Sequence, residues 1–401
     1  MLEKKIRQAY EQGEGILRLA PVFVPRPFSQ PGHRLKLHPD DYFALGTRRG
    51  AIKERWFSSV IAANNGPLAA PDEGMSYVAP TDDPADRFTL RDAVEELGAQ
   101  AIGEELLQKY GTWPMYSKFF DYSVPLFHHV HLTFDKAAMV NRLGKPECYY
   151  YPPQLNNYDG SMPATYFGFS PEVTPEEVKE RLRDYEKRDI RITELSRAFR
   201  IQLGTGWYTP AGVVHAPGSY LTYEPQWNSD VNSVYENVAS GEVYSKDFLN
   251  EHCPEDKKDD IDYIFSLLDW EKNIDPDYRK HYFRPPVLIE DAPSGCVEKW
   301  VVYANPYVAA KELTVLPGQE AVIQDGAAYG LILTQGHGKL GVHDCETPTL
   351  LRFGQISCDE FFVSERAAIE GVRIRNASKV EPLVMLKHFG PTPPGMPERV
   401  K

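Results

Sequence analysis

The stretch PLFHHVHLTFD, residues 125–135, places three histidines within four positions of an otherwise apolar and β-branched segment. Such a composition is typical of a β-strand. Because successive side chains of a strand point to opposite faces, we expect His129 and His131 on one face and His128 on the other. Two imidazoles at positions i and i+2 can hold one metal ion, but a lone pair of this kind is more often a half-buried polar pair. The segment by itself leaves both interpretations open.

Two later segments carry side chains of matching chemistry. GKPECYYY contains Glu147, and GWYTPAGVVHAPG carries a tight turn at 210–212 just before His215. Three imidazoles and one carboxylate suit zinc, manganese, iron or nickel, and they leave positions open for substrate oxygens. The three motifs in the order HxH, Glu and PxGxxH therefore predict a metal site with the ligands His129, His131, Glu147 and His215.

The composition of the whole chain bounds the class of protein. With 401 residues, 42% of them hydrophobic and 25% charged, the chain has the composition of a soluble globular protein. The net charge of −13 argues against nucleic acid or an anionic membrane as a partner. The five cysteines form no CxxC pair, the N-terminus has no signal-peptide core, and no run approaches the ~20 apolar residues of a membrane span. We therefore expect a cytoplasmic protein with a small-molecule partner; the oligomeric state stays open.

Local patterns predict a mainly β chain with helical insertions. Residues 2–12 are expected to form a short amphipathic helix, residues 21–32 an extended proline-rich arm, and residues 89–110 one or two helices. A capping box at Thr174 and Glu177 predicts the start of a further helix. Strands are expected after residue 113, among them 147–152, 164–169, 198–202 and 219–224.

These patterns suggest four regions. We expect an N-terminal arm and mixed α/β segment at 1–110 that packs on a first β domain at 111–245. A helical insertion at about 171–197 interrupts that first domain, which holds the metal. A helical or loop connector at 246–290 leads to a second β domain at 291–401, whose histidines lack the ligand pattern, so that no metal is expected there.

At these motifs the sequence resembles the cupin superfamily, and within it the type I mannose-6-phosphate isomerases. The resemblance rests on WPMYSKFFDYSVPLFHHVHL at 113–132, GKPECYY at 144–150 and GWYTPAGVVHAPGSYLTYEPQWNSD at 206–230. Fainter similarity extends over most of the chain. The resemblance implies a double cupin, with two β jelly-roll barrels.

The resemblance also assigns roles within the site. It places the metal ligands at His129, His131, Glu147 and His215, and it implies one divalent ion, with zinc first and manganese, iron or nickel as alternatives. Lys118 matches the active-site lysine of that family, and Glu224 matches the glutamate after the last ligand strand. The implied activity is the interconversion of an aldose and a ketose through an enediol, with Glu224 as base and Lys118 stabilising the enediolate. Both side chains would otherwise be structural ion-pair partners.

Three departures from the family pattern concern the substrate. Phe127 replaces a serine, His129 replaces a glutamine, and an arginine expected shortly after the SD pair is absent from SDVNSVYEN. The sugar and its phosphorylation state therefore stay open, and the cations that could substitute for the arginine are Arg142, Lys145 and Arg200. Two other functions remain alternatives, a metal-dependent oxygenase and a sugar-binding cupin without catalysis.

Overall fold

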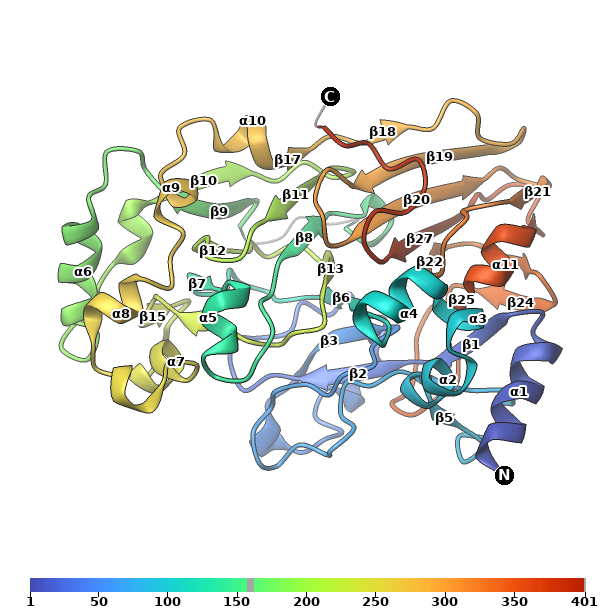
Figure 1. The fold of residues 1–401 in the computed structure, drawn as a ribbon, viewed down its shortest axis with the longest axis horizontal. Helices are drawn as coiled ribbons and strands as arrows, with labels where there is room; N and C mark the ends of the chain where they lie inside the picture. Colours follow the sequence, from blue (N-terminus) through green and yellow to red (C-terminus); the bar gives the residue numbers. More distant parts are fainter. Residues whose placement is uncertain (157–161, 400–401) are drawn as a thin grey trace.

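The computed structural model describes residues 1–156 and 162–399. Five sheets, whose named strands all pair antiparallel, make up most of its regular structure (Figure 1). The prediction of a mainly β chain with helical insertions is therefore confirmed.

Two of the sheets surround the predicted metal site. One has seven strands in the order β17-β11-β8-β13-β6-β3-β2, and the other has five in the order β10-β9-β12-β7-β14. The strands of the first are β2 Val22–Pro25, β3 Ile52–Phe57, β6 Met115–Phe120, β8 Glu147–Tyr150, β11 Gly206–Thr209, β13 Thr222–Trp227 and β17 Phe283–Arg284. Those of the second are β7 His129–Val130, β9 Ala164–Phe169, β10 Ser196–Arg200, β12 His215–Ala216 and β14 Ser233–Val234.

Two further sheets occupy the other half of the molecule. The nine-stranded sheet has the order β18-β19-β20-β27-β22-β25-β1-β4-β5, and the four-stranded sheet has the order β21-β26-β23-β24. The strands of the first are β1 Ile16–Ala20, β4 Tyr77–Val78, β5 Phe88–Thr89, β18 Val287–Leu288, β19 Cys296–Val302, β20 Ala309–Val315, β22 Tyr329–Gln335, β25 Glu360–Val363 and β27 Leu383–Phe389. The others are β21 Glu320–Ile323, β23 His337–Leu340, β24 His343–Glu346 and β26 Val372–Asn376, with the separate hairpin of β15 Val238–Ala239 and β16 Glu242–Val243.

Side-chain alternation along the strands packs these sheets into four layers. On β22, Ile332 contributes to a core that it shares with Tyr223 of the seven-stranded sheet, whereas Leu331 and Leu333 contribute to a core with the four-stranded sheet. A third, aromatic core that includes Phe120, Tyr149 and Phe167 joins the seven-stranded sheet to the five-stranded one. The order of layers is therefore five-, seven-, nine- and four-stranded.

The helices gather at the two ends of this stack. Helices α6, α7 and α8 lie at one end, and α1 to α4 lie with α11 at the other (Figure 1). The helices are α1 Leu2–Gln12, α2 Leu90–Leu97, α3 Ala99–Ile102, α4 Glu104–Tyr110, α5 Phe134–Ala138, α6 Pro175–Arg183, α7 Lys246–Asn250, α8 Ile261–Phe265, α9 Trp270–Asn273, α10 Tyr278–Tyr282 and α11 Glu365–Glu370. Single 3-10 turns occur at Pro39–Asp41, Thr47–Arg49, Pro153–Leu155, Ile192–Leu195 and Glu255–Lys257. Among the described residues, no helix has the length and apolar character needed to cross a lipid bilayer.

Helix α6 begins as its sequence predicts. The Thr174 side chain accepts a hydrogen bond from the Glu177 N–H, and the Glu177 carboxylate accepts one from the Thr174 N–H at 2.7 Å. Val178 and Leu182 are buried against residues of the five-stranded sheet. The helix thus covers the face of that sheet opposite to the seven-stranded one.

The proline-rich arm is extended, as predicted, and places β2 at the edge of the seven-stranded sheet. Proline has no N–H to donate to a neighbouring strand, so Pro25 is tolerated on an edge strand, where one side has no neighbour to pair with. The N-terminal strands divide between the two halves of the molecule, since β2 and β3 join the seven-stranded sheet whereas β1, β4 and β5 join the nine-stranded sheet. The arm therefore reaches the edge of the region that contains the histidines.

Candidate metal centre

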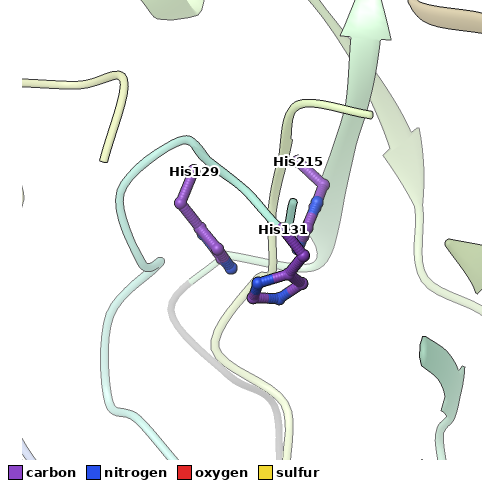
Figure 2. A group of neighbouring side chains, drawn as sticks. All are labelled: His129, His131 and His215. Carbon is purple, nitrogen blue, oxygen red and sulfur yellow. The ribbon is translucent and has the colours of Figure 1, made fainter. Parts of the chain in front are cut away.

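Three imidazoles converge between the five- and seven-stranded sheets. His129 lies on β7, His131 follows that strand, and His215 on β12 is paired with His129 across the two strands. Their ring centroids are 4.2–5.0 Å apart, and one nitrogen of each lies within 4.8 Å of the others. Figure 2 shows the three rings directed toward a common point. The three histidines could together hold a metal ion. The prediction that His129 and His131 lie on one face of the strand is confirmed.

Each ring is oriented by a backbone carbonyl. The Nδ1 atoms of His129, His131 and His215 lie 3.0, 2.7 and 2.8 Å from the carbonyl oxygens of Phe127, Val231 and Val213. A carbonyl oxygen can only accept a hydrogen bond, so each neutral ring carries its proton on Nδ1 and keeps a lone pair on Nε2. This is the tautomer that a metal-binding histidine needs when Nε2 is the ligand atom.

Burial keeps the imidazoles of His129 and His131 uncharged. It lowers the pKa of His131 to about 3, and burial together with the neighbouring His215 and His131 rings holds the pKa of His129 well below its usual range. Metal ions bind the neutral ring, so these groups need lose no proton before they bind an ion at neutral pH.

Glu147 approaches the same point from the opposite sheet. Its Oε2 lies 2.9 Å from His131 Nε2, and its Oε1 lies 3.2 Å from His215 Nε2. Burial opposes ionisation, but the interactions with the His131 ring and with the Lys145 ammonium outweigh it and hold the pKa of the Glu147 carboxyl well below its usual range. Three imidazole nitrogens and one carboxylate make a set that fits a divalent cation.

Lys118 and Glu224 lie directly opposite each other on β6 and β13. Lys118 Nζ is 3.2 Å from Glu224 Oε1, and Lys145 Nζ is 3.5 Å from the same oxygen. Burial and the charge of Glu147 raise the pKa of Glu224 to about 8. A carboxyl group with such a pKa can exchange a proton near neutral pH.

A cavity of about 260 Å³ opens onto these groups. His129, His131, Lys118, Lys145 and Glu224 all contribute to its wall. Six aromatic residues also line it: Phe28, Phe120, Tyr122, Phe127, Tyr149 and Phe248. All six side chains named from the sequence are therefore in or beside one cavity. Glu147 and His215 are not part of its wall, but Glu147 contacts His131 and His215, and the His215 ring lies against that of His129.

Of the remaining candidates from the sequence, one lines the cavity and the others do not. His128 Nδ1 lies 2.8 Å from Glu236 Oε2 and takes no part in the cluster, as expected from strand alternation. Of the cations proposed to replace the family arginine, Lys145 lines the cavity, whereas Arg142 and Arg200 are exposed and lie outside its wall.

Three charged side chains of the cavity escaped the sequence analysis. Arg26, Glu54 and Asp230 form a buried group in which Arg26 Nε and Nη2 each lie 3.1 Å from a Glu54 oxygen, and Nη2 lies 3.0 Å from Asp230. Arg26 stands in the proline-rich arm, and Glu54 stands in the wholly buried strand β3. The local signals were the charged triplet Lys-Glu-Arg inside an otherwise apolar strand, for Glu54, and the SD pair of the family motif, for Asp230.

Comparisons with known proteins bear on the fold. No family model matches the chain, and no curated protein matches its sequence. A protein provisionally assigned as a mannosephosphate isomerase from Archaeoglobus fulgidus superposes with a TM-score of 0.61 at 14% identity, over 94% of this chain and 98% of that one. The mannose 6-phosphate isomerase of Bacillus subtilis gives 0.60 at 17% identity, over 93% and 99%. The chain shares the fold of the mannose-6-phosphate isomerases.

A zinc-bound mannose 6-phosphate isomerase also superposes, with a TM-score of 0.60 at 11% identity, over 94% of this chain and 100% of that one. The resemblance found in the motifs between 113 and 230 is thus confirmed as a likeness of fold to these isomerases over nearly the whole chain.

Proposed function

We propose that the protein is a metal-dependent aldose–ketose isomerase acting on a sugar or a sugar phosphate. The observation that carries this proposal is the convergence of three Nε2 lone pairs and Glu147 beside a cavity whose wall holds Glu224, with its pKa near 8. The fold, which is that of the mannose-6-phosphate isomerases, supports it.

His129, His131, Glu147 and His215 would hold one divalent ion. Zinc is the first expectation, supported by the zinc-bound isomerase of the same fold, and manganese, iron or nickel suit the same donors. Such an ion, when bound, polarises the carbonyl and the neighbouring hydroxyl of an open-chain sugar.

Glu224 acts as the base that carries the proton between C1 and C2. A pKa of about 8 lets the carboxylate take the proton from one carbon and return it to the other without a large penalty for either step.

Lys118 places a positive charge beside the transferring proton. Its ammonium, 3.2 Å from Glu224 Oε1, can donate hydrogen bonds to the oxygen that gains negative charge in the enediolate. Lys118 is a positioning partner of Glu224 as well, since the two side chains form a direct cross-strand pair.

We also propose that the four layers are two cupin barrels. The metal-binding cupin would lie within 111–245, with the helical insertion on its outer face, and a metal-free cupin would lie within 291–401 beyond the connector at 246–290. The location of the three-histidine cluster supports this division, since it is the one such cluster among the described residues and all its members lie in the first region.

The direct test joins metal analysis of the purified protein to a panel of free and phosphorylated aldoses and ketoses. We expect one divalent ion per chain, and isomerisation with solvent deuterium appearing at the carbon next to the carbonyl. The double variant His131→Ala, His215→Ala should lose both the ion and the activity. His128→Gln, a change in the neighbouring histidine that faces away, is the matched control and should retain the ion.

Unchanged metal content in the double variant would remove the proposed site. Metal retained by the wild type without turnover of any sugar would favour a binding protein, and consumption of oxygen by the metal-loaded protein would favour an oxygenase.

A further inference from the structure

The guanidinium of Arg26, which lines the cavity, already donates hydrogen bonds to two carboxylates. Arg26 presents Nε and Nη2 to Glu54 as a two-pronged pair, and the second N–H of Nη2 reaches Asp230 at 3.0 Å. Its Nη1 donates to Asn65 Oδ1 at 2.9 Å. A phosphate is recognised by an arginine through two parallel N–H groups, and Arg26 has no complete pair left to offer.

The two lysines of the cavity also have carboxyl partners. Lys118 Nζ lies 3.2 Å from Glu224 and 3.7 Å from Glu54, and Lys145 Nζ lies 3.0 Å from Glu147. Three cations, Arg26, Lys118 and Lys145, thus face three ionised carboxylates, Glu54, Glu147 and Asp230. The carboxyl group of Glu224, whose pKa is about 8, also contacts Lys118. The wall of the cavity therefore has no cationic side chain without a carboxyl partner among the described residues.

Glu54 and Asp230 remain ionised despite their burial. Burial opposes it, but Arg26 and Lys118 lower the pKa of Glu54 to about 2 and hold the pKa of Asp230 below its ordinary value. A dianionic phosphate placed beside them would meet their charge in a poorly screened site, where repulsion between like charges is strong.

The opening of the cavity adds negative charge and neutral amides. Glu251 accepts a hydrogen bond from the Asn64 side chain at 3.1 Å, and the Asn64 N–H donates to Asp230 at 2.8 Å. Asn64, Asn65 and Asn232 contribute to the wall together with the aromatic rings of Phe28 and Phe248. Amides can exchange hydrogen bonds with hydroxyl groups in both directions, and aromatic faces suit the C–H surface of a sugar ring.

We propose that this cavity selects an uncharged, unphosphorylated sugar, and that Asp230 and Glu251 exclude phosphate monoesters from it. The proposal rests on the function proposed above and specifies its substrate class. Within the described residues, every Lys or Arg that lines the cavity has a carboxyl partner at 3.2 Å or less. A phosphate could bind one of these cations only by breaking an ion pair, whereas sugar hydroxyl groups can bind the remaining polar side chains without such a loss.

The test compares free sugars with their phosphates in the metal-loaded wild-type protein. We expect kcat/KM for the preferred free aldose to exceed that for its 6-phosphate by at least about ten-fold, the effect of one unfavourable charge contact of modest strength. Titration calorimetry with mannitol and mannitol 6-phosphate, neither of which can react, measures the same preference without turnover.

Removal of negative charge should relax the exclusion. Asp230→Asn withdraws one of the two carboxylates that hold Arg26, and Glu251→Gln neutralises an exposed group at the opening. Each is expected to tighten binding of mannitol 6-phosphate by several-fold, about the effect of one screened unit charge. Asp82→Asn removes a charge of the same sign from a surface carboxylate paired with Arg18 and should leave binding unchanged. Because Glu251 is exposed, its variant remains informative even if the Asp230 variant fails to fold.

The two proposals fail separately. A wild-type preference for the phosphorylated sugar in turnover, or for mannitol 6-phosphate in calorimetry, would overturn the inference and leave the isomerase intact. Failure to isomerise any sugar, with mannitol bound more tightly than its phosphate, would remove the isomerase and uphold the exclusion. Equal tightening of phosphate binding in the Asp82 control would overturn the role of Asp230 and Glu251.

Discussion

The directions of the three imidazoles follow from contacts close to each ring. His129 and His215 each place Nδ1 against the carbonyl two residues earlier in the chain, and His131 uses the carbonyl of Val231. The first two contacts depend on local backbone, whereas the third requires a segment one hundred residues away. The orientation of each imidazole is therefore determined by the hydrogen-bond partner of Nδ1 as much as by the position of the histidine in its strand.

Glu224 gives the first prediction for a single side chain. In Glu224→Gln the amide cannot accept the proton, so kcat should fall by at least about 100-fold. Metal content should stay at the wild-type level, because Glu224 is not among the proposed ligands. Steady-state kinetics and metal analysis measure the two effects, and Glu172→Gln, a change in an exposed glutamate, is the matched control. Activity within a few-fold of wild type would show that another group moves the proton.

Lys118 provides a pH-dependent prediction. Its charge lowers the pKa of Glu224, against the rise caused by burial and by Glu147. In Lys118→Met that opposing effect is lost, so the pKa of Glu224 should rise further and the base form should appear only at higher pH. The acidic limb of the kcat/KM profile should thus move upward by about one pH unit. An unmoved limb with a lower maximum would mean that Lys118 acts on the substrate alone.

Single elements differ in how far their local sequence determines them. The helix after Thr174 was predicted from its capping box and is observed with both hydrogen bonds, and the strand predicted at 164–169 is β9. The strand predicted at 219–224 is shifted, since β13 runs from Thr222 to Trp227. A capping box and the composition of a strand involve only a few neighbouring residues, so they can be recognised in the sequence. The ends of a strand depend on the neighbouring strands with which it pairs.

The capping box of α6 gives a prediction at this level. Thr174→Ala removes the side chain that accepts from the Glu177 N–H, and the free energy of unfolding should fall by about 1 kcal/mol. Urea denaturation measures the loss, and Thr174→Ser, which retains the hydroxyl, should recover most of it. Metal content and kcat/KM should stay unchanged, because α6 covers the outer face of the five-stranded sheet. A parallel loss of metal would show that the insertion supports the site.

Contacts that depend on the assembly of the whole molecule could not be predicted from the sequence. Arg26, Glu54 and Asp230 meet only because the arm, β3 and the segment after β13 are brought together by the sheet order β13-β6-β3-β2. Neighbouring strands in that order are separated by tens of residues in the sequence. The pairing of such strands is decided by the total burial that the sheet achieves, which no local pattern records. The three histidines and Glu147 were singled out because their motifs are local, whereas Arg26 and Glu54 were missed because their meeting depends on the order of the strands.

One contact between the two central sheets links stability to pH. Tyr223 OH on β13 lies 2.8 Å from His388 Nδ1 on β27, and burial lowers the pKa of His388 to about 3. The unfolded chain has an ordinary histidine pKa near 6.5, so between pH 6.5 and 3 it binds a proton that the folded state does not. The free energy of unfolding must therefore fall as the pH falls through this window.

His388→Gln tests this coupling because glutamine does not titrate. Between pH 7 and pH 5 the metal-free wild type should lose about 2 kcal/mol more of its unfolding free energy than the variant does, as linkage requires for one histidine that stays neutral when folded. Urea denaturation at both pH values measures the difference, and the other buried histidines cancel because both proteins contain them. Equal losses in the two proteins would mean that His388 is protonated within the folded state, and that the interface between the central sheets admits a charge that its burial should exclude.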